Sequence, residues 1–437
     1  MALIHPSSAE STQTGLDLFD IPPTQTAVTD GFFEEHHPLS TLSYGAPIQF
    51  TINGDTEFYL DLQNTFLHIK AKVTKADGTN LDDRATVAPV NNWLHSLFSQ
   101  VDVYLNGTLI TPSDNSYPYR AYLSSLLTTN PYVKKGVLTS ELYYQDTPGK
   151  LDIEQAEHND GLKSRQALSS KSKTLDLFGP LAIDISQQSK FLPPGVTVQI
   201  NLTPSKSSFN LIADDPAQGY KSVITHASLH VRKSKVNPGI ILAHEKVLSN
   251  TTAKYPIKRI GTKIFGIPGG QLSHIQDNLF MSQTPVRLFV TLVDTDAFGG
   301  VYKKNPFDFK TKDLNFLSLY LDGKQIPSGT PLTPNYEHGE YVRAYHGLMS
   351  ALGLANNLEA GGVLSYQDFA QGFTIYGFDL SPSLTDGDSS FELLRSSPLR
   401  IELKFAKELD TAVNVVCLGV FDNIIEIDKT RQVLKDF

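Results

Sequence analysis

One stretch of sequence occurs twice in this 437-residue chain, once in each half. The first copy, at 103–127, reads VYLNGTLITPSDNSYPYRAYLSSLL, and the second, at 319–352, reads LYLDGKQIPSGTPLTPNYEHGEYVRAYHGLMSAL. In both copies an apolar run is followed by Asn-Gly or Asp-Gly, a loop and an Arg-Ala-Tyr segment. We call this the repeated motif; its matching residues are Tyr104, Gly107, Arg120 and Tyr122 in the first copy and Tyr320, Gly323, Arg343 and Tyr345 in the second.

The repeated motif has a clear local structure. Asn-Gly and Asp-Gly allow the positive φ angles of a tight hairpin turn. Arg120 and Arg343 are placed to reach carboxylates or carbonyls beside that turn. Any β protein contains such hairpins, but YYQDTPG (143–149) and SYQDFAQG (365–372) add a further match in the same order. These ordered matches indicate gene duplication and two similar domains.

Alternating apolar and polar residues dominate both halves. In the run 67–73, Leu, Ile, Ala and Val alternate with His and Lys, which is typical of a strand with one buried face. Other expected strands include LAIDIS (181–186), and the best helical candidate is 119–127. The 30 Gly and 25 Pro fit many turns. The pattern predicts an all-β fold of two tandem eight-stranded jelly rolls, with short helices in loops.

The length suits two domains of ordinary size. The expected division is an N-terminal arm at 1–30, a first jelly roll at 31–235, a connection at 236–260, a second jelly roll at 261–425 and a C-terminal tail at 426–437. The arm contains an apolar island, Leu16, Leu18, Phe19 and Ile21, in a polar segment. Two interpretations stay open: the island packs on its own domain, or it docks on a neighbouring subunit.

Charge and cysteine content restrict the function. The net charge of −9 makes direct, sequence-specific binding of nucleic acid a poor expectation, because phosphate binding needs a clustered positive face. The single cysteine, Cys417, lies in an apolar strand pattern and is expected to be buried. The N-terminal residues lack the pattern of a signal peptide, and no apolar run approaches the roughly 20 residues that span a bilayer.

Several longer motifs resemble one family. These are LFDIPPTQTAV, VNNWLHSLFSQVDVYLNGTLI, YPYRAYLSSLL, NPF, YLDGKQ, YVRAY and the terminal NIIEIDKTRQVLKDF. They are similar to the major capsid proteins of Polinton (Maverick) elements and adintoviruses, and the resemblance covers nearly the whole chain. It implies a double jelly-roll coat protein of the lineage that includes virophage, adenovirus and large algal-virus capsid proteins.

The resemblance also implies a function. The chain would be a major capsid protein that forms pseudo-hexagonal homotrimers and self-assembles into an icosahedral virion shell. Its partners would be other copies of itself, a vertex (penton) protein and minor capsid proteins, without a membrane span. It would be made in the host cell interior, with the nucleus as one candidate assembly site, and would end in the virion. The tail residues Val433, Leu434 and Phe437 would tuck beneath their own trimer or reach a neighbour.

Enzymatic chemistry finds little support in the sequence. No nucleophile elbow, phosphate-binding loop or dinucleotide fingerprint occurs. The densest group of metal-ligand types, Glu34 to His37, lies along one segment, and adjacent strand residues point to opposite faces. We therefore predict no catalytic, cofactor-binding or metal residues.

Two other functions remain as alternatives. One is a carbohydrate-binding or carbohydrate-active tandem β-sandwich. Such a site needs exposed aromatic side chains, whereas the single tryptophan, Trp93, is expected to be packed in the interior. The other is a minor capsid or scaffold protein.

Overall fold

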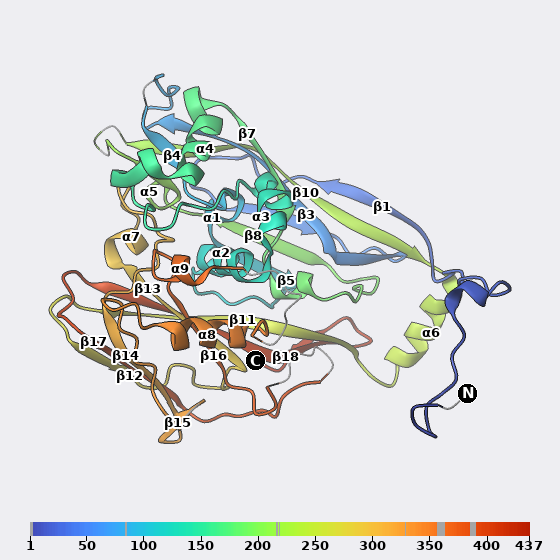
Figure 1. The fold of residues 1–437 in the computed structure, drawn as a ribbon. Helices are drawn as coiled ribbons and strands as arrows, with labels where there is room; N and C mark the ends of the chain where they lie inside the picture. Colours follow the sequence, from blue (N-terminus) through green and yellow to red (C-terminus); the bar gives the residue numbers. More distant parts are fainter. Residues whose placement is uncertain are drawn as a thin grey trace.

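The computed structural model describes residues 3–83, 85–215, 217, 219–327, 329–355, 363–384 and 390–437. Strands predominate, and they form two successive jelly rolls with short helices between strands (Figure 1). The predicted fold class is therefore confirmed.

The first jelly roll consists of two four-stranded sheets. Their strand orders are β1-β10-β3-β7 and β2-β8-β5-β6, and all neighbours are antiparallel. A separate pair, β4-β9, lies outside these sheets. The strands are β1 Val28–His36, β2 Ile48–Ile52, β3 Phe58–Lys75, β4 Val87–Pro89, β5 Phe98–Leu105, β6 Thr108–Leu109, β7 Leu175–Pro180, β8 Val198–Pro204, β9 Leu211–Ala213 and β10 Tyr220–Val236.

The second jelly roll repeats this topology strand by strand. Its sheets have the orders β11-β18-β13-β16 and β12-β17-β14-β15, and β19 pairs with β18. If strands are matched in chain order, both sheets have the order of the first jelly roll, which supports duplication. The strands are β11 Ala253–Ile267, β12 Ser273–Gln276, β13 Arg287–Asp294, β14 Leu314–Leu321, β15 Lys324–Ile326, β16 Ile375–Asp379, β17 Leu399–Phe405, β18 Val413–Ile427 and β19 Val433–Lys435.

Helices occupy the connections. The α-helices are α1 Trp93–Ser96, α2 Tyr117–Thr128, α3 Pro131–Lys135, α4 Asp160–Ser169, α5 Ser207–Asn210, α6 Pro238–Leu248, α7 Thr295–Gly299, α8 Val342–Ala351 and α9 Tyr366–Phe369. The 3₁₀ helices are η1 Thr14–Leu16, η2 Val137–Glu141, η3 Ile153–His158, η4 Ser170–Ser172 and η5 Asp184–Gln187. The helix expected at 119–127 is thus found as the longer α2.

The period-two pattern gives the core of the first jelly roll. In β3, Leu67, Ile69, Ala71 and Val73 are all buried, whereas His68, Lys70 and Lys72 are partly exposed. The second jelly roll follows the same rule in β17, where the residues at alternate positions from Leu399 to Phe405 are buried. Alternation of this kind places one apolar face of each sheet inside the sandwich.

Two sequence predictions are wrong in detail. The strand expected at 181–186 is absent, because β7 stops pairing with β3 at Pro180 and Asp184 starts the 3₁₀ helix η5. The Asp184 side chain turns inward to Arg120, and this contact outweighs the local strand pattern.

The other correction concerns the domain boundaries. β1 begins at Val28, inside the segment predicted as the arm, and β11 begins at Ala253, inside the predicted connection. The residues 253–260 form a strand because Tyr255 and Ile257 are buried at alternate positions. Pro256 lies within this strand and lacks the backbone N–H that a central strand would need for pairing. It is tolerated because β11 is an edge strand. The helix α6 occupies the remaining connection.

A buried polar network joins the two jelly rolls. The Asp146 carboxylate accepts hydrogen bonds from Arg165 Nη2 (2.7 Å) and, across the junction, from Asn305 Nδ2 (3.0 Å). The Arg165 and Asp146 side chains are fully buried. Because an unpaired buried charge is costly, this network fixes the contact between the domains.

Asp308, near the same junction, makes stability depend on pH. Burial raises the pKa of this carboxyl to about 7, although Lys310 Nζ lies 3.4 Å from Oδ2. The folded chain therefore keeps a proton that the unfolded chain releases near pH 4, so this group's stabilising effect declines as pH rises from about 4 to 7. We expect Asp308→Asn to exceed the wild-type Tm slightly at pH 5 and more strongly at pH 8, where the difference should be on the order of 5 °C.

The measurement is differential scanning fluorimetry between pH 5 and pH 8. Asp313→Asn is the matched control, because the Asp313 side chain is 48% exposed. An offset between Asp308→Asn and wild type that is the same at every pH would contradict the explanation.

Candidate assembly surfaces and a histidine-rich sheet face

Both copies of the repeated motif form a hairpin followed by a helix. In the first copy, β5 and β6 are joined at Asn106 and Gly107, which have φ angles of 46° and 81°. In the second copy, β14 and β15 are joined at Asp322 and Gly323, with φ angles of 51° and 75°. The consecutive positive φ angles are those of the tight turn that the sequence indicates.

The two motif arginines have different surroundings. Arg120 is buried, and its Nη2 donates to Asp184 Oδ1 at 2.5 Å. Arg343 is exposed, and it donates to the carbonyl oxygen of Pro331 (3.3 Å) and to Thr330 Oγ1 (3.1 Å). One arginine thus reaches a carboxylate and the other a carbonyl.

The tyrosines of the motif differ in the same way. Tyr122 is fully buried and stacks on Phe307 of the second jelly roll at 4.2 Å between ring centroids. Tyr345, the matching residue, is partly buried, and its hydroxyl donates to the Leu364 carbonyl oxygen at 2.9 Å. Tyr104 and Tyr320 lie in β5 and β14, and both are partly buried.

The helices of the two motifs are therefore covered to different degrees. α2 lies between the two jelly rolls (Figure 1), and Tyr119 stacks on Phe298 of α7 at 5.4 Å. Val342 occupies the position in α8 that Tyr119 occupies in α2, yet it is 60% exposed, whereas Tyr119 is 2% exposed. The same face of the same motif is thus covered in the first jelly roll and open in the second.

The N-terminal arm leaves its apolar island in solvent. Leu16, Leu18, Phe19 and Ile21 are 70%, 75%, 93% and 87% exposed. The arm extends beside α6, away from the two sandwiches (Figure 1). Packing of the island on its own domain is not observed in this chain.

The C-terminal tail is bound to its own chain. β19 pairs with β18, Val433 is buried, and the Arg259 guanidinium lies 4.9 Å from the centre of the Phe437 ring. Leu434 is 46% exposed. The tail also reaches the first jelly roll, because the Arg431 carbonyl oxygen accepts from Asn106 Nδ2 at 2.7 Å. The tail thus connects the second jelly roll to the turn of the first motif.

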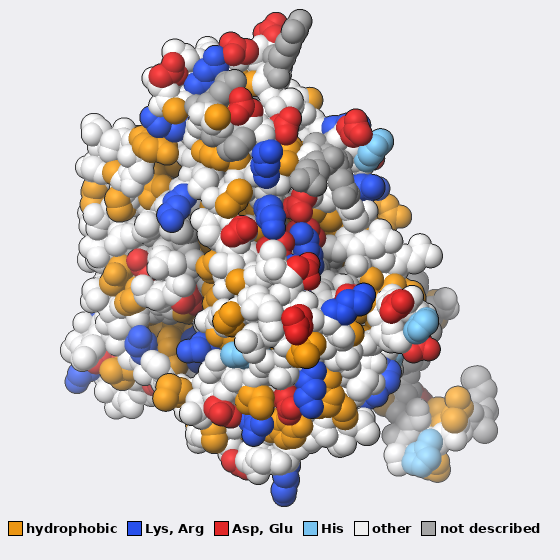
Figure 2. Space-filling model, turned by 90° about the vertical axis from the view of Figure 1, so that its left-hand side faces the viewer, with side chains coloured by type: hydrophobic (Ala, Val, Ile, Leu, Met, Phe, Trp, Pro, Cys, Tyr) orange, Lys and Arg blue, Asp and Glu red, His pale blue; other side chains and the backbone are white. Residues whose placement is uncertain are grey.

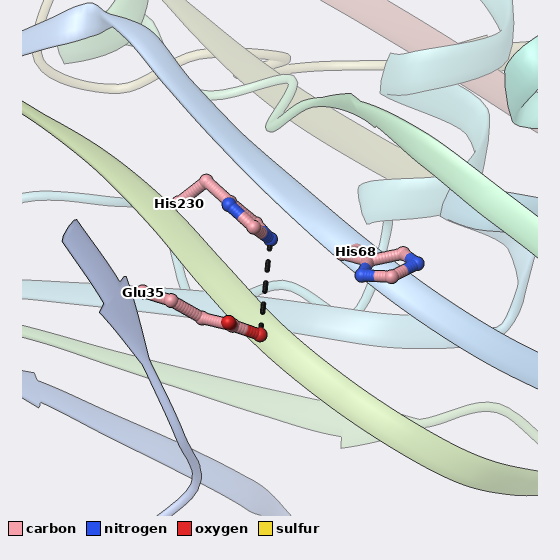
Figure 3. A group of neighbouring side chains, drawn as sticks. All are labelled: Glu35, His68 and His230. Carbon is pink, nitrogen blue, oxygen red and sulfur yellow. Dashed lines mark ion pairs between the residues drawn. The ribbon is translucent and has the colours of Figure 1, made fainter. Parts of the chain in front are cut away.

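Glu35, His68 and His230 meet on the outer face of the sheet β1-β10-β3-β7 (Figure 3). In the sequence, only the contiguous residues 34–37 stand out as a dense group of metal-ligand types. Alternation separates these as expected, because Glu34 and His36 lie near Lys233 while Glu35 faces His230. The sequence did not reveal His68 and His230 as neighbours of Glu35, because they lie far from it along the chain, in β3 and β10.

The remaining expectations concern Cys417, Trp93, the surface charge and membrane-spanning helices. Cys417 and Trp93 are fully buried, as expected, and burial raises the pKa of the Cys417 thiol. On the face drawn in Figure 2, the described acidic and basic side chains are interspersed and form no continuous basic area. Within the described ranges, no helix has both the length and the apolar character needed to cross a membrane.

The chain was compared with known proteins. No family model matches it. The uncharacterized protein F54H12.2 of Caenorhabditis elegans is 25% identical over 427 residues, which cover 95% of this chain and 99% of that protein. The match therefore extends over nearly the full length of both proteins.

Solved structures of viral proteins share the fold. A chain of the Sputnik virophage matches with a TM-score of 0.65 at 11% identity and covers 100% of this chain and 94% of its own. The Faustovirus major capsid protein matches with a TM-score of 0.58 at 10% identity (94% and 92% covered). The mavirus major capsid protein matches with a TM-score of 0.56 at 12% identity (99% and 97% covered). The chain has the double jelly-roll fold of these viral major capsid proteins.

Proposed function

We propose that this protein is a major capsid protein that forms pseudo-hexagonal homotrimers, which assemble into an icosahedral shell. The support has two parts. The fold matches those of viral major capsid proteins over nearly their whole length. The chain also contains two domains of one topology, so three chains supply six similar domains to a ring.

The observation that carries the proposal is the unequal covering of α2 and α8. In a closed ring, first and second jelly rolls alternate, and each presents the same face to the next domain. The α2 face already meets the second jelly roll of its own chain through Tyr119 and Tyr122. The matching α8 face, which includes Val342, then requires the first jelly roll of another chain.

The first experiment measures the solution mass by light scattering and images the main species by negative stain. We expect a mass three times the 48.2 kDa of the chain and a hexagonal outline. Val342→Glu should convert this trimer to monomer, because the interface would have to bury an unpaired charge.

Leu168→Glu is the matched control, since Leu168 is also an exposed apolar helix residue (40% exposed, in α4). This variant should remain trimeric. A wild-type protein that stays monomeric at high concentration and at every salt concentration tested would overturn the proposal.

The narrower assignment is to the capsid proteins of Polinton-type elements and adintoviruses. It is supported by the sequence motifs that resemble these proteins. The partners in this proposal are further copies of the chain, a vertex protein and minor capsid proteins. The final location is the virion, after synthesis inside the host cell.

A further inference from the structure

Three strands bring a carboxylate and two imidazoles to one point on the outer face of the first jelly roll. Glu35 of β1 is the direct cross-strand partner of His230 in β10. His68 of β3 is paired with Ser228, two residues from His230, so the two histidines are diagonal neighbours. Diagonal neighbours on adjacent strands lie within reach of long side chains. The side chains of all three residues project from the sheet on the same side (Figure 3).

The distances are close to those of a metal site. One ligand atom from each residue lies within 4.8 Å of the other two, and Glu35 Oε1 is 3.9 Å from His230 Nε2. Atoms that share a Zn²⁺ ion at ~2.1 Å in a tetrahedral arrangement lie about 3.4 Å apart. Closing this difference needs small side-chain rotations, and Glu35 is exposed and has room for them.

A neighbouring carboxylate orients one of the histidines. His68 Nε2 lies 2.6 Å from Asp176 Oδ1, on the adjacent strand β7. Metal-binding histidines commonly donate one ring N–H to a carboxylate, which leaves the other nitrogen for the metal. This contact leaves Nδ1 of His68 as the available ligand atom.

We propose that Glu35, His68 and His230 bind a divalent transition-metal ion, with Zn²⁺ as the ion of best-matched chemistry. Imidazole nitrogen combined with one carboxylate suits zinc and its neighbours in the first transition series, whereas Mg²⁺ and Ca²⁺ take oxygen ligands. Three protein ligands leave a position for water or a further donor. His226, whose Nε2 is 4.0 Å from Glu35 Oε1, is such a donor. This proposal does not depend on the capsid function.

The competing explanation is a structural cluster held by polar contacts and ring packing, in which Ser228 Oγ lies 3.4 Å from His230 Nε2. Phe178 lies 5.5 Å from His230 and 5.9 Å from His68 between ring centroids, so the imidazoles also act as flat side chains on this sheet face. Packing of this kind gives no selective affinity for metal ions, and direct measurement of binding separates the two explanations.

The test uses untagged full-length protein that has been stripped with a chelator and dialysed. Zn²⁺ affinity is measured by competition with a chromogenic indicator, and bound zinc per chain is measured by elemental analysis. We expect about one ion per chain with a Kd near or below about 1 μM, and no competition from excess Mg²⁺ or Ca²⁺. The triple variant Glu35→Gln/His68→Ala/His230→Ala should bind at least about 100-fold more weakly.

Matched variants make the result decisive. His158→Ala/His338→Ala removes two exposed histidines elsewhere and should keep wild-type affinity. Asp176→Asn should weaken binding about tenfold without changing the Tm of the metal-free protein. Zinc binding that persists in the folded triple variant, or that falls equally in the control, would overturn the site. Because zinc is counted per chain, the result does not depend on whether the protein is trimeric.

Discussion

Arg120→Met is expected to lower the free energy of unfolding by about 3–5 kcal/mol, whereas Arg343→Met should lower it by about 1 kcal/mol or less. The two arginines occupy the same position in the repeated motif, but only Arg120 is buried with a carboxylate partner, Asp184. Removing Arg120 takes away the cation that is hydrogen-bonded to Asp184. Arg259 still acts on this carboxylate electrostatically, and Asp184 also accepts from the Ile260 N–H at 3.2 Å. Chemical denaturation of both variants in parallel gives the comparison.

The pH dependence of the Arg120→Met loss tests its cause. Burial already raises the pKa of Asp184 in the wild type. Without the Arg120 guanidinium this pKa should rise further, because taking up a proton relieves the cost of the buried charge. Stability of the variant should then fall as pH increases, and the loss should be smaller at pH 5 than at pH 8.

Arg120→Met/Asp184→Asn should recover part of the loss, because the asparagine is neutral and still accepts from Ile260. If the Arg120 and Arg343 variants lose equal stability, the different covering of the two motifs has no energetic consequence and the explanation fails.

The repeated motif illustrates what sequence could and could not predict. Asn-Gly, Asp-Gly and the alternating strands specify local geometry, so the two hairpins and the sheets around them follow from the chain itself. The different burial of Arg120 and Arg343 cannot be predicted from the local sequence, because both residues lie in an Arg-Ala-Tyr segment. Their difference arises from the second jelly roll, which covers α2 and leaves α8 open.

The histidine-rich face was missed for a related reason. Glu35, His68 and His230 become neighbours only through the register of β1, β10 and β3. Strand alternation gives the face on which each residue lies, but a one-residue shift in pairing would separate them. Sequence therefore shows which residues can share a face and not which of them meet.

Changing Leu16, Leu18, Phe19 and Ile21 together to serine is expected to abolish shell assembly and to leave the capsomer intact. This prediction rests on the proposed capsid function. The four side chains are at least 70% exposed in the single chain. Burying each on a neighbouring subunit would contribute about 1.5–3 kcal/mol, so each arm would add an upper limit of about 6–12 kcal/mol to contacts between capsomers. Light scattering and electron microscopy of assembly mixtures measure the effect.

The same variant shows whether the arm docks within its own capsomer or on a neighbouring one. If the island docks on a neighbouring capsomer, the Tm and mass of the isolated capsomer stay unchanged, and protease cuts the wild-type arm in capsomers but not in shells. If the island instead packs within its own capsomer, the variant lowers the capsomer Tm and the arm is protected before assembly. Leu168→Ser/Met281→Ser, which changes exposed apolar residues outside the arm, should assemble normally. Assembly failure in this control would show that general loss of apolar surface, and not the arm, is responsible.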